Sequence, residues 1–165
     1  MSYPEWYRAI SEPFRSAAAS RTVDLLDKGL VLAIALSYVI ALCWLAFSGD
    51  VRFWKCLIVP AFTFGLVSVL RSLLDRPRPY SSFDMDPILA KETTGRSFPS
   101  RHVSSAVVIA CALLWLNPVA GTLALIASAV VAATRIIGGV HFPRDVVAAI
   151  VIACACALVG FVAIP

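Results

Sequence analysis

The sequence predicts an all-α fold: a polytopic membrane bundle of about five transmembrane helices plus an N-terminal interfacial helix, in a single membrane-embedded domain of residues 1–165. Hydrophobic residues make up 60% of the chain, charged residues only 15%, and the mean hydropathy is +0.86. A soluble domain is typically about 45–50% apolar and about 25% charged. The apolar residues also form charge-free segments about as long as the roughly 20 residues that cross a bilayer. These observations predict a multi-pass protein of the cell membrane.

Four apolar segments are expected to contain the five spans. Residues 29–49 and 53–74 predict the first two. Residues 103–134 carry no charge but are too long for a single span. Pro118 divides them into the third and fourth spans, because proline starts helices well and breaks their interiors. Residues 146–164 predict the fifth span.

The first 28 residues differ in character from the spans. Aromatic residues such as Tyr3, Trp6 and Tyr7 alternate there with charged ones. This mixture is typical of a helix that lies in the membrane interface. The alternative for residues 1–28 is a frayed polar tail.

Polar residues gather in two regions, "RSLLDRPRPYSSFDMDPILAKETTGRSFPSRH" at 71–102 and "TRIIGGVHFPRD" at 134–145. Together these regions contain both histidines and eight of the fourteen basic residues. Counting spans from the N-terminus places both regions on one face of the membrane, whereas the other face receives only short links. Charge near lipid is costly and is usually paired or functional. We therefore expect a site on this face, with residues 75–98 as its loop.

Two prolines are expected to set the geometry of this site. Pro99 fits the first position of the third-span helix, which would place His102 in the first turn, beside the free N–H groups that bind anions. Pro143 likewise begins the last span, with Asp145 in its first turn and His141 just ahead. The carboxylate is four residues on and can reach one imidazole nitrogen, fixing the tautomer and leaving the other nitrogen free.

These residue types suit phosphoryl transfer without a metal. Two histidines in different environments can divide the nucleophile and acid roles. Arginine forks match phosphate oxygens, and Arg71, Arg78 and Arg135 lie in the two regions. The five cysteines all lie in apolar segments with no histidine or carboxylate beside them, so we expect neither a metal site nor a disulfide. No cofactor is expected.

The net charge of +4 does not indicate a nucleic-acid partner. The arginines cluster at span ends, and no basic stripe on a soluble domain is apparent. The bilayer is the expected partner at this stage. The oligomeric state is left open.

Three motifs, in order and correctly spaced, resemble the phosphatidic acid phosphatase type 2 superfamily, which also contains the vanadium haloperoxidases. The family pattern is lysine, six residues, Arg-Pro; then Pro-Ser-Gly-His; then Ser-Arg, five residues, His, three residues, Asp. Here the motifs read "RSLLDRPRP", "PSRH" and "TRIIGGVHFPRD". Three positions depart from the pattern: Arg71 replaces the lysine, Arg101 the glycine and Thr134 the serine. The chain also has one span fewer than the six usual in the membrane members.

The resemblance implies a role for each matching residue. His141 would attack phosphorus and form a phosphohistidine, Asp145 would orient His141, and His102 would protonate the leaving group. The implied phosphate ligands are Arg71, Arg78, Ser100, Arg101 and Arg135. An alternative for Arg71 is that it only anchors its helix at the membrane interface.

The function that follows is a metal-independent integral membrane phosphatase that hydrolyses lipid phosphate monoesters or diphosphates. Candidate substrates are a polyprenyl pyrophosphate such as undecaprenyl pyrophosphate, phosphatidylglycerol phosphate and phosphatidate. The first is slightly favoured, since additional basic residues could hold a second phosphate: Arg76, Lys91, Arg96 and Arg101. The alternative function is a non-hydrolytic lipid carrier or binding protein, which would not need His141 held by Asp145 opposite a second histidine.

Two indications of orientation disagree. Twelve of the fourteen Lys and Arg residues lie in the N-terminal segment and on the site face, so the positive-inside rule places the site in the cytoplasm. The family resemblance places it on the outer face. The sequence leaves the side of the membrane open.

Overall fold

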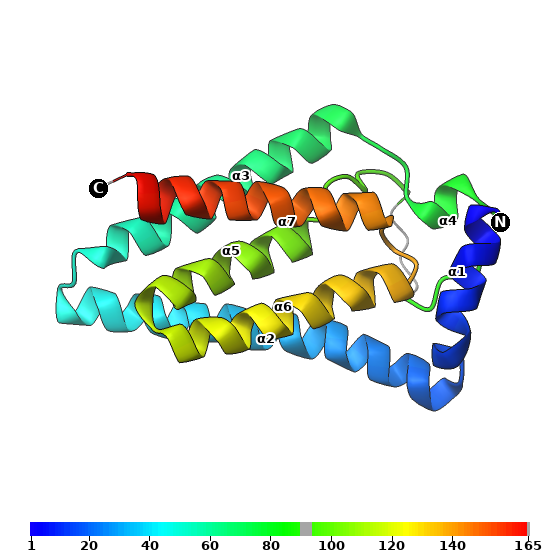
Figure 1. The fold of residues 1–165 in the computed structure, drawn as a ribbon, viewed down its shortest axis with the longest axis horizontal. Coiled ribbons are helices and arrows are strands. Elements are labelled where there is room, and N and C mark those ends of the chain that lie inside the picture. Colours follow the sequence, from blue (N-terminus) through cyan, green and yellow to red (C-terminus); the bar gives the residue numbers. More distant parts are fainter. Residues whose placement is uncertain (90–93, 165) are drawn as a thin grey trace.

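The computed structural model describes residues 1–89 and 94–164 and consists of helices joined by loops, with no strand in those ranges. In chain order the helices are α1 (Tyr3–Ser11), η1 (Glu12–Phe14), α2 (Ala17–Ser48), α3 (Arg52–Leu74), α4 (Pro79–Ser82), α5 (Arg101–Leu116), α6 (Pro118–Ile137), α7 (Pro143–Ala157) and η2 (Leu158–Ala163). η2 continues α7 as a π-helix. The predicted all-α fold is confirmed (Figure 1).

Four of the described helices are long and apolar enough to cross a membrane: α2, α3, α6, and α7 with η2. The remaining predicted span is α5, which is apolar but has only 16 residues. Its expected start at Pro99 is wrong, because the helix begins at Arg101 with Ser100 as the N-cap. The carbonyl of Pro99 instead accepts a hydrogen bond from Arg71 Nη1 at 2.8 Å, which holds Pro99 in the preceding loop.

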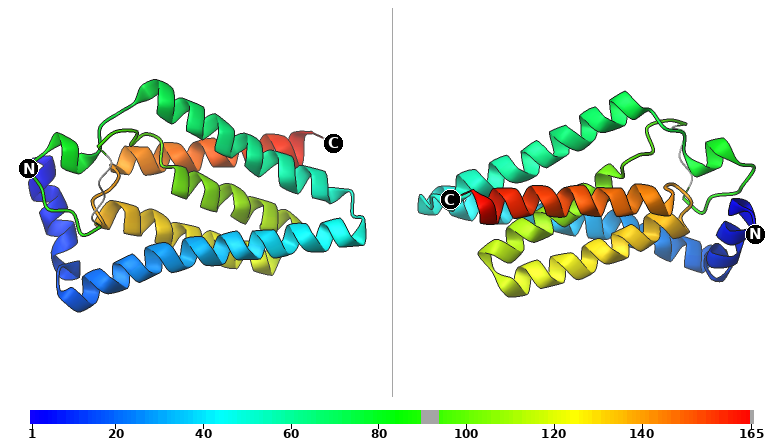
Figure 2. Two further views of the ribbon diagram at one scale, coloured as in Figure 1. Left: turned by 180° about the vertical axis from the view of Figure 1, so that it is seen from behind. Right: turned by 45° about the horizontal axis from the view of Figure 1, so that its top comes forward.

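Helix α5 lies in the middle of the bundle, in contact with α2, α3, α6 and α7 (Figures 1 and 2). Small buried side chains on α5 and α7, such as Ala110, Ala149 and Ala153, line its contacts. The α5–α6 hairpin is so tight that a Cβ at Gly121 would lie 2.1 Å from the Cα of Leu114. Large apolar side chains such as Phe47 remain exposed on the outside, where a bilayer would cover them.

Helix α1 lies across one end of the bundle, beside the loops that precede α5 and α7 (Figure 1). The Tyr7 hydroxyl donates to the Ile137 carbonyl at 3.1 Å and accepts from the Ile88 N–H at 3.2 Å. Gly139, with φ of 75°, packs directly against Tyr7, since a Cβ there would lie 2.7 Å from the Tyr7 oxygen. The N-terminal helix is therefore tied to the turn between α6 and α7.

Helix α2 begins twelve residues before the expected first span, so residues 17–28 belong to it and not to the N-terminal segment. The Ser16 side chain caps this helix by accepting from the Ala19 N–H at 3.3 Å. Asp27 and Lys28 look too polar for a span in the sequence. Asp27 is nevertheless buried against Arg135 of α6, which allows the helix to continue through it.

Candidate active site

His141 lies in the turn between α6 and α7 and is 2% exposed. Its backbone N–H donates to the Arg135 carbonyl at 3.3 Å, which closes the turn against the end of α6. Asp145, in the first turn of α7, is 1% exposed, and its Oδ2 lies 3.7 Å from His141 Nδ1. The predicted proximity of the histidine and the carboxylate is present.

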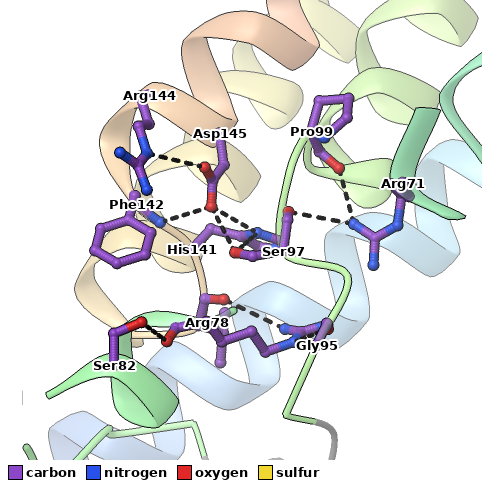
Figure 3. A network of polar contacts seen from close by, with 11 residues as sticks. Arg71, Arg78, Ser82, Gly95, Ser97, Pro99, His141, Phe142, Arg144 and Asp145 are labelled. Carbon is purple, nitrogen blue, oxygen red and sulfur yellow. Dashed lines mark hydrogen bonds and ion pairs between the residues drawn. The ribbon is translucent and has the colours of Figure 1, made fainter. Parts of the chain in front are cut away.

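Ser97 bridges this pair (Figure 3). Its hydroxyl donates to Asp145 Oδ2 at 2.5 Å and lies 3.4 Å from His141 Nδ1. Asp145 Oδ2 also accepts from the Phe142 N–H at 3.1 Å, so the carboxylate is fixed from two sides. Because the Ser97 proton goes to Asp145, its oxygen is available to accept from Nδ1–H. This arrangement assigns the proton to Nδ1 and leaves the lone pair on Nε2.

Burial lowers the pKa of His141 to about 4, against the opposing effect of the hydrogen bond toward Asp145. The imidazole is therefore neutral at neutral pH. A neutral imidazole with a free Nε2 is the nucleophilic form of histidine.

Arg71 and Arg78 reach into the loop that precedes α5 (Figure 3). Arg71, on α3, donates from Nη1 to the Ser97 carbonyl at 3.4 Å and to the Pro99 carbonyl at 2.8 Å. Arg78 donates from Nε to the Gly95 carbonyl and from Nη1 to the Val140 carbonyl, both at 3.3 Å. Both side chains are buried, so Arg71 is not an arginine that extends to the membrane surface. The two arginines hold the Ser97 loop and the His141 turn together.

Arg135, near the end of α6, is 2% exposed. Its Nε lies 2.9 Å from Oδ1 of Asp27 on α2. Both Nε and Nη1 are buried, and neither makes a hydrogen bond among the described residues. A buried donor without a partner needs an explanation, such as a bound ion.

Ser100 is fully buried as well, and its hydroxyl has no hydrogen-bond partner in the described part of the chain. Its backbone N–H donates to the Asp145 carbonyl at 3.1 Å, which joins the start of α5 to the first turn of α7. The buried hydroxyl of Ser100 and the guanidinium of Arg135 can both donate to an anion. Their positions next to the start of α5 suit a phosphate.

His102 lies in the first turn of α5 and is partly exposed. It lines a cavity of about 400 Å³ together with Asp27 and Arg135. It also lines a second cavity of about 260 Å³ with Phe64 and Arg101. The exposed Arg101 guanidinium lies over the Phe64 ring, 5.3 Å from its centre. His102 is therefore the histidine of the site that borders open space.

The structure places all eight predicted site residues at the loop 94–100, at the His141 turn or along the two cavities beside His102. Arg101 differs from the other seven because its side chain is exposed. Sequence reasoning missed Ser97 and Asp27. A signal for Ser97 was its position two residues before the "PSRH" motif, on a serine-containing loop. A signal for Asp27 was a carboxylate adjoining a charge-free apolar segment. Lys91 lies outside the described residues.

No group of three or more His, Cys, Asp or Glu side chains within residues 1–89 and 94–164 is arranged to hold a metal ion. The positive charge near His141 comes from arginines. Arg144 also lies nearby, with Nε 3.7 Å from Asp145 Oδ1, but its side chain is exposed.

Comparison with known proteins gives two kinds of match. The family model of the PAP2 superfamily matches residues 52–165. Among solved structures, Aquifex aeolicus LpxE is similar with a TM-score of 0.75 and 21% sequence identity, over 94% of this chain and 92% of that one. The first transmembrane PAP2 type phosphatidylglycerolphosphate phosphatase from Bacillus subtilis is similar with a TM-score of 0.51 and 21% identity, over 94% and 90%. A search of curated protein sequences gave no match.

Proposed function

Because the chain belongs to the PAP2 superfamily, we propose that it is a metal-independent membrane phosphatase that hydrolyses lipid phosphates through a phosphohistidine on His141. The observation that carries this proposal is the buried His141 with its Nδ1 side held by Ser97 and Asp145. The same end of the bundle holds buried donors on Ser100 and Arg135 that make no hydrogen bond among the described residues. A fixed neutral imidazole beside unpaired donors suits attack on a phosphate.

In the first step, Nε2 of His141 attacks phosphorus and the bond from phosphorus to the lipid oxygen breaks. His102 gives its proton to that oxygen, so the lipid leaves as an alcohol or, from a pyrophosphate, as a monophosphate. The imidazole gains positive charge as the new P–N bond forms. The Asp145 carboxylate stabilises this charge through Ser97 and Nδ1.

In the second step, a water molecule attacks the phosphohistidine. His102, now neutral, takes a proton from the water, and the P–N bond breaks to release inorganic phosphate. His141 returns to its neutral form. His102 thus acts as an acid in the first step and as a base in the second, while His141 carries the phosphoryl group between them.

Arginines take the part that metal ions play in many other phosphoryl transfers, which is to neutralise the charge on the phosphate oxygens. Arg71, Arg78 and Arg135 are fixed by carbonyl or carboxylate partners before a substrate arrives. A preorganised set of charges loses little free energy to reorganisation at the moment of reaction.

The apolar space next to the site supports a lipid substrate. The cavity of about 260 Å³ beside His102 is lined by residues of α2, α3 and α5. A further cavity of about 420 Å³, farther along the same helices, shares Phe64, Ser105 and Ile109 with it. A chain of methylenes lying in this groove would keep its phosphate at the mouth, next to His102 and Arg101.

We keep three candidate substrates within this class. Phosphatidylglycerol phosphate is supported by the similarity to a solved phosphatidylglycerolphosphate phosphatase. A polyprenyl pyrophosphate is supported by the additional basic residues Arg76, Arg96 and Arg101 near the loop. Phosphatidate fits the same phosphate site. The proposed location is the cell membrane.

The test is phosphate release by the purified protein in detergent from each of these lipids, in the presence of excess EDTA. We expect release from at least one lipid, inhibition by orthovanadate, and no release by the His141→Ala variant. Activity that EDTA abolishes and Mg²⁺ or Zn²⁺ restores would rule out this mechanism. Lipid binding without any release would identify a non-hydrolytic carrier instead.

A further inference from the structure

Asp27 stands apart from the three motifs and from the matched residues 52–165. It lies on α2 and is 4% exposed, although carboxylates are rarely buried unless paired. Its Oδ1 lies 2.9 Å from Arg135 Nε and accepts a hydrogen bond from the Thr134 hydroxyl at 3.1 Å. The carboxylate therefore contacts a predicted phosphate ligand and the residue next to it.

The ion pair uses one edge of the Arg135 guanidinium. Nε lies 2.9 Å from Asp27 Oδ1 as an ion-pair contact, whereas Nη1 is not part of that pair, and neither buried nitrogen makes a hydrogen bond among the described residues. Asp27, Arg135 and His102 line the same cavity of about 400 Å³. The pair thus forms part of the wall of the space that also contains the proposed acid.

Without a carboxylate nearby, a buried guanidinium would be costly and would have no fixed orientation. Arg135 is on α6, and the carboxylate that meets it comes from α2, a different helix. Asp27 therefore ties the orientation of the guanidinium to the packing of α2 against α6. The Thr134 hydroxyl contacts the same carboxylate oxygen and shares its proton with the Val131 carbonyl at 2.8 Å.

We propose that Asp27 is a positioning residue for the phosphatase reaction: it holds Arg135 by Nε so that the Nη end binds the phosphate. This inference rests on the proposed function, because it assumes that Arg135 is a phosphate ligand. It assigns to α2, outside the matched family region, a part in the phosphate site. Displacing a positioned group by about 1 Å can cost about 10²-fold in rate.

The test compares Asp27→Ala and Asp27→Asn with wild type in two measurements: kcat/KM on the best lipid phosphate, and the dissociation constant of orthovanadate measured by titration without turnover. We expect Asp27→Ala to lose about 10²-fold in kcat/KM and to bind vanadate more weakly. Asp27→Asn, which keeps an oxygen that can accept from Nε, should recover part of both. Both values are corrected for the folded fraction, taken from thermal unfolding.

Asp50→Asn is the matched control, because Asp50 also pairs with an arginine, with its Oδ2 2.7 Å from Arg52 Nη2, but lies just beyond the far end of α2. It should leave both measurements unchanged. In an Arg135→Ala background, Asp27→Ala should cause little further loss, because Asp27 acts through Arg135. A full additional loss in that background would overturn the proposal, as would wild-type vanadate affinity in folded Asp27→Ala.

If Asp27→Ala does not fold, Asp27→Glu takes its place, because it keeps the charge but moves the carboxylate by one methylene. Weakened vanadate binding is then expected, and wild-type binding would overturn the proposal. The vanadate titration also separates the two hypotheses. If wild-type protein binds vanadate but releases no phosphate, the proposed hydrolysis is wrong, and the vanadate affinities of the variants still decide the role of Asp27. If wild-type protein neither binds vanadate nor releases phosphate, both the proposed hydrolysis and the role of Asp27 are wrong.

Discussion

The surroundings of His141 and His102 differ in almost every respect, although we propose that both act in one site. His141 is enclosed in a turn, with Ser97 and Asp145 on one side of its ring. His102 begins the central helix α5 and borders two cavities. The enclosed histidine has a fixed tautomer and orientation, whereas the other has access to substrate, product and water. A nucleophile needs a fixed tautomer and orientation. A group that gives up and regains a proton needs access to substrate and water.

The largest expected effect comes from the enclosed histidine. His141→Ala should reduce activity to the uncatalysed background on every substrate, because no other group replaces its Nε2. Acid-quenched labelling with a radioactive lipid phosphate should trap phosphate on wild type and none on the variant. Labelled phosphate trapped on His141→Ala would show that the two histidines have been assigned the wrong way round.

His102→Ala should have a smaller effect that depends on the substrate. General acid catalysis typically contributes about 10²–10⁴-fold, and the variant should lose about that much on alkyl phosphates. The loss should be smaller on pyrophosphates, because a leaving phosphate needs less protonation than an alkoxide. Rates on both kinds of substrate check this, and equal losses on both would contradict the role of His102 as an acid.

Arg71 binds the loop that precedes α5, because its Nη1 donates to the carbonyls of Ser97 and Pro99. Arg71→Ala should lose about 10²-fold in kcat/KM, because Ser97 and the start of α5 shift relative to His141. Arg71→Lys keeps the charge and should retain a substantial part of the activity. Arg52→Ala, on the same helix at the opposite end of the bundle, serves as the control and should match wild type. A wild-type rate for Arg71→Ala would show that its contacts with the loop are not needed for the reaction.

Ser97→Ala should cost about tenfold in kcat, corresponding to the roughly 1–3 kcal/mol lost when a buried hydrogen-bonding group loses its partner. The direct approach of Asp145 to His141 remains in this variant, which is why the loss is modest. Ser48→Ala, whose hydroxyl donates only to the Leu45 carbonyl of its own helix, is the matched control. If Ser97→Ala is as slow as Asp145→Ala, the serine is the sole link between the carboxylate and the ring.

The smallest expected effect is the change of kcat/KM between pH 8 and pH 5. The depressed pKa of His141, about 4, means that the imidazole stays neutral from pH 8 down to pH 5. Protonation removes the Nε2 lone pair, so kcat/KM should fall only as the pH drops through about 4. The same shift predicts that the folded state loses stability as the pH falls from about 6.5 to about 4, because in this range the unfolded chain binds a proton on His141 more readily than the folded chain does. A pH-rate profile with an acid limb near 6.5 would contradict the enclosed state of His141.

The sequence was most informative where partners are close along the chain. His141 and Asp145 are four residues apart, so the helix start at Pro143 fixes their relative position whatever the rest of the fold does. The spacing of the motifs likewise placed Arg78 and Arg135 near the site. The apolar segments predicted the bundle because a bilayer requires helices of a certain length.

Contacts between distant segments were not predictable in this way. Ser97 reaches Asp145 across 48 residues, and Asp27 reaches the residues 134 and 135 across more than 100. Which face of α2 meets α6 depends on how the whole bundle packs, and this information is spread over many small apolar contacts. The start of α5 was misplaced for a related reason: Arg71 on α3 binds the carbonyl of Pro99, and a local pattern does not reveal that interaction.

The shortness of α5 has a consequence for the lipid. At 1.5 Å per residue its 16 residues are about 24 Å long, against about 30 Å for the 20 residues of α6, and the two helices meet at Asn117. The start of α5 therefore lies about 6 Å short of the end of α6. Lifting a lipid out of the bilayer costs about 0.8 kcal/mol for each methylene exposed to water. A lipid phosphate that meets His102 in the first turn of α5 therefore exposes fewer methylenes to water than one drawn up to the end of α6.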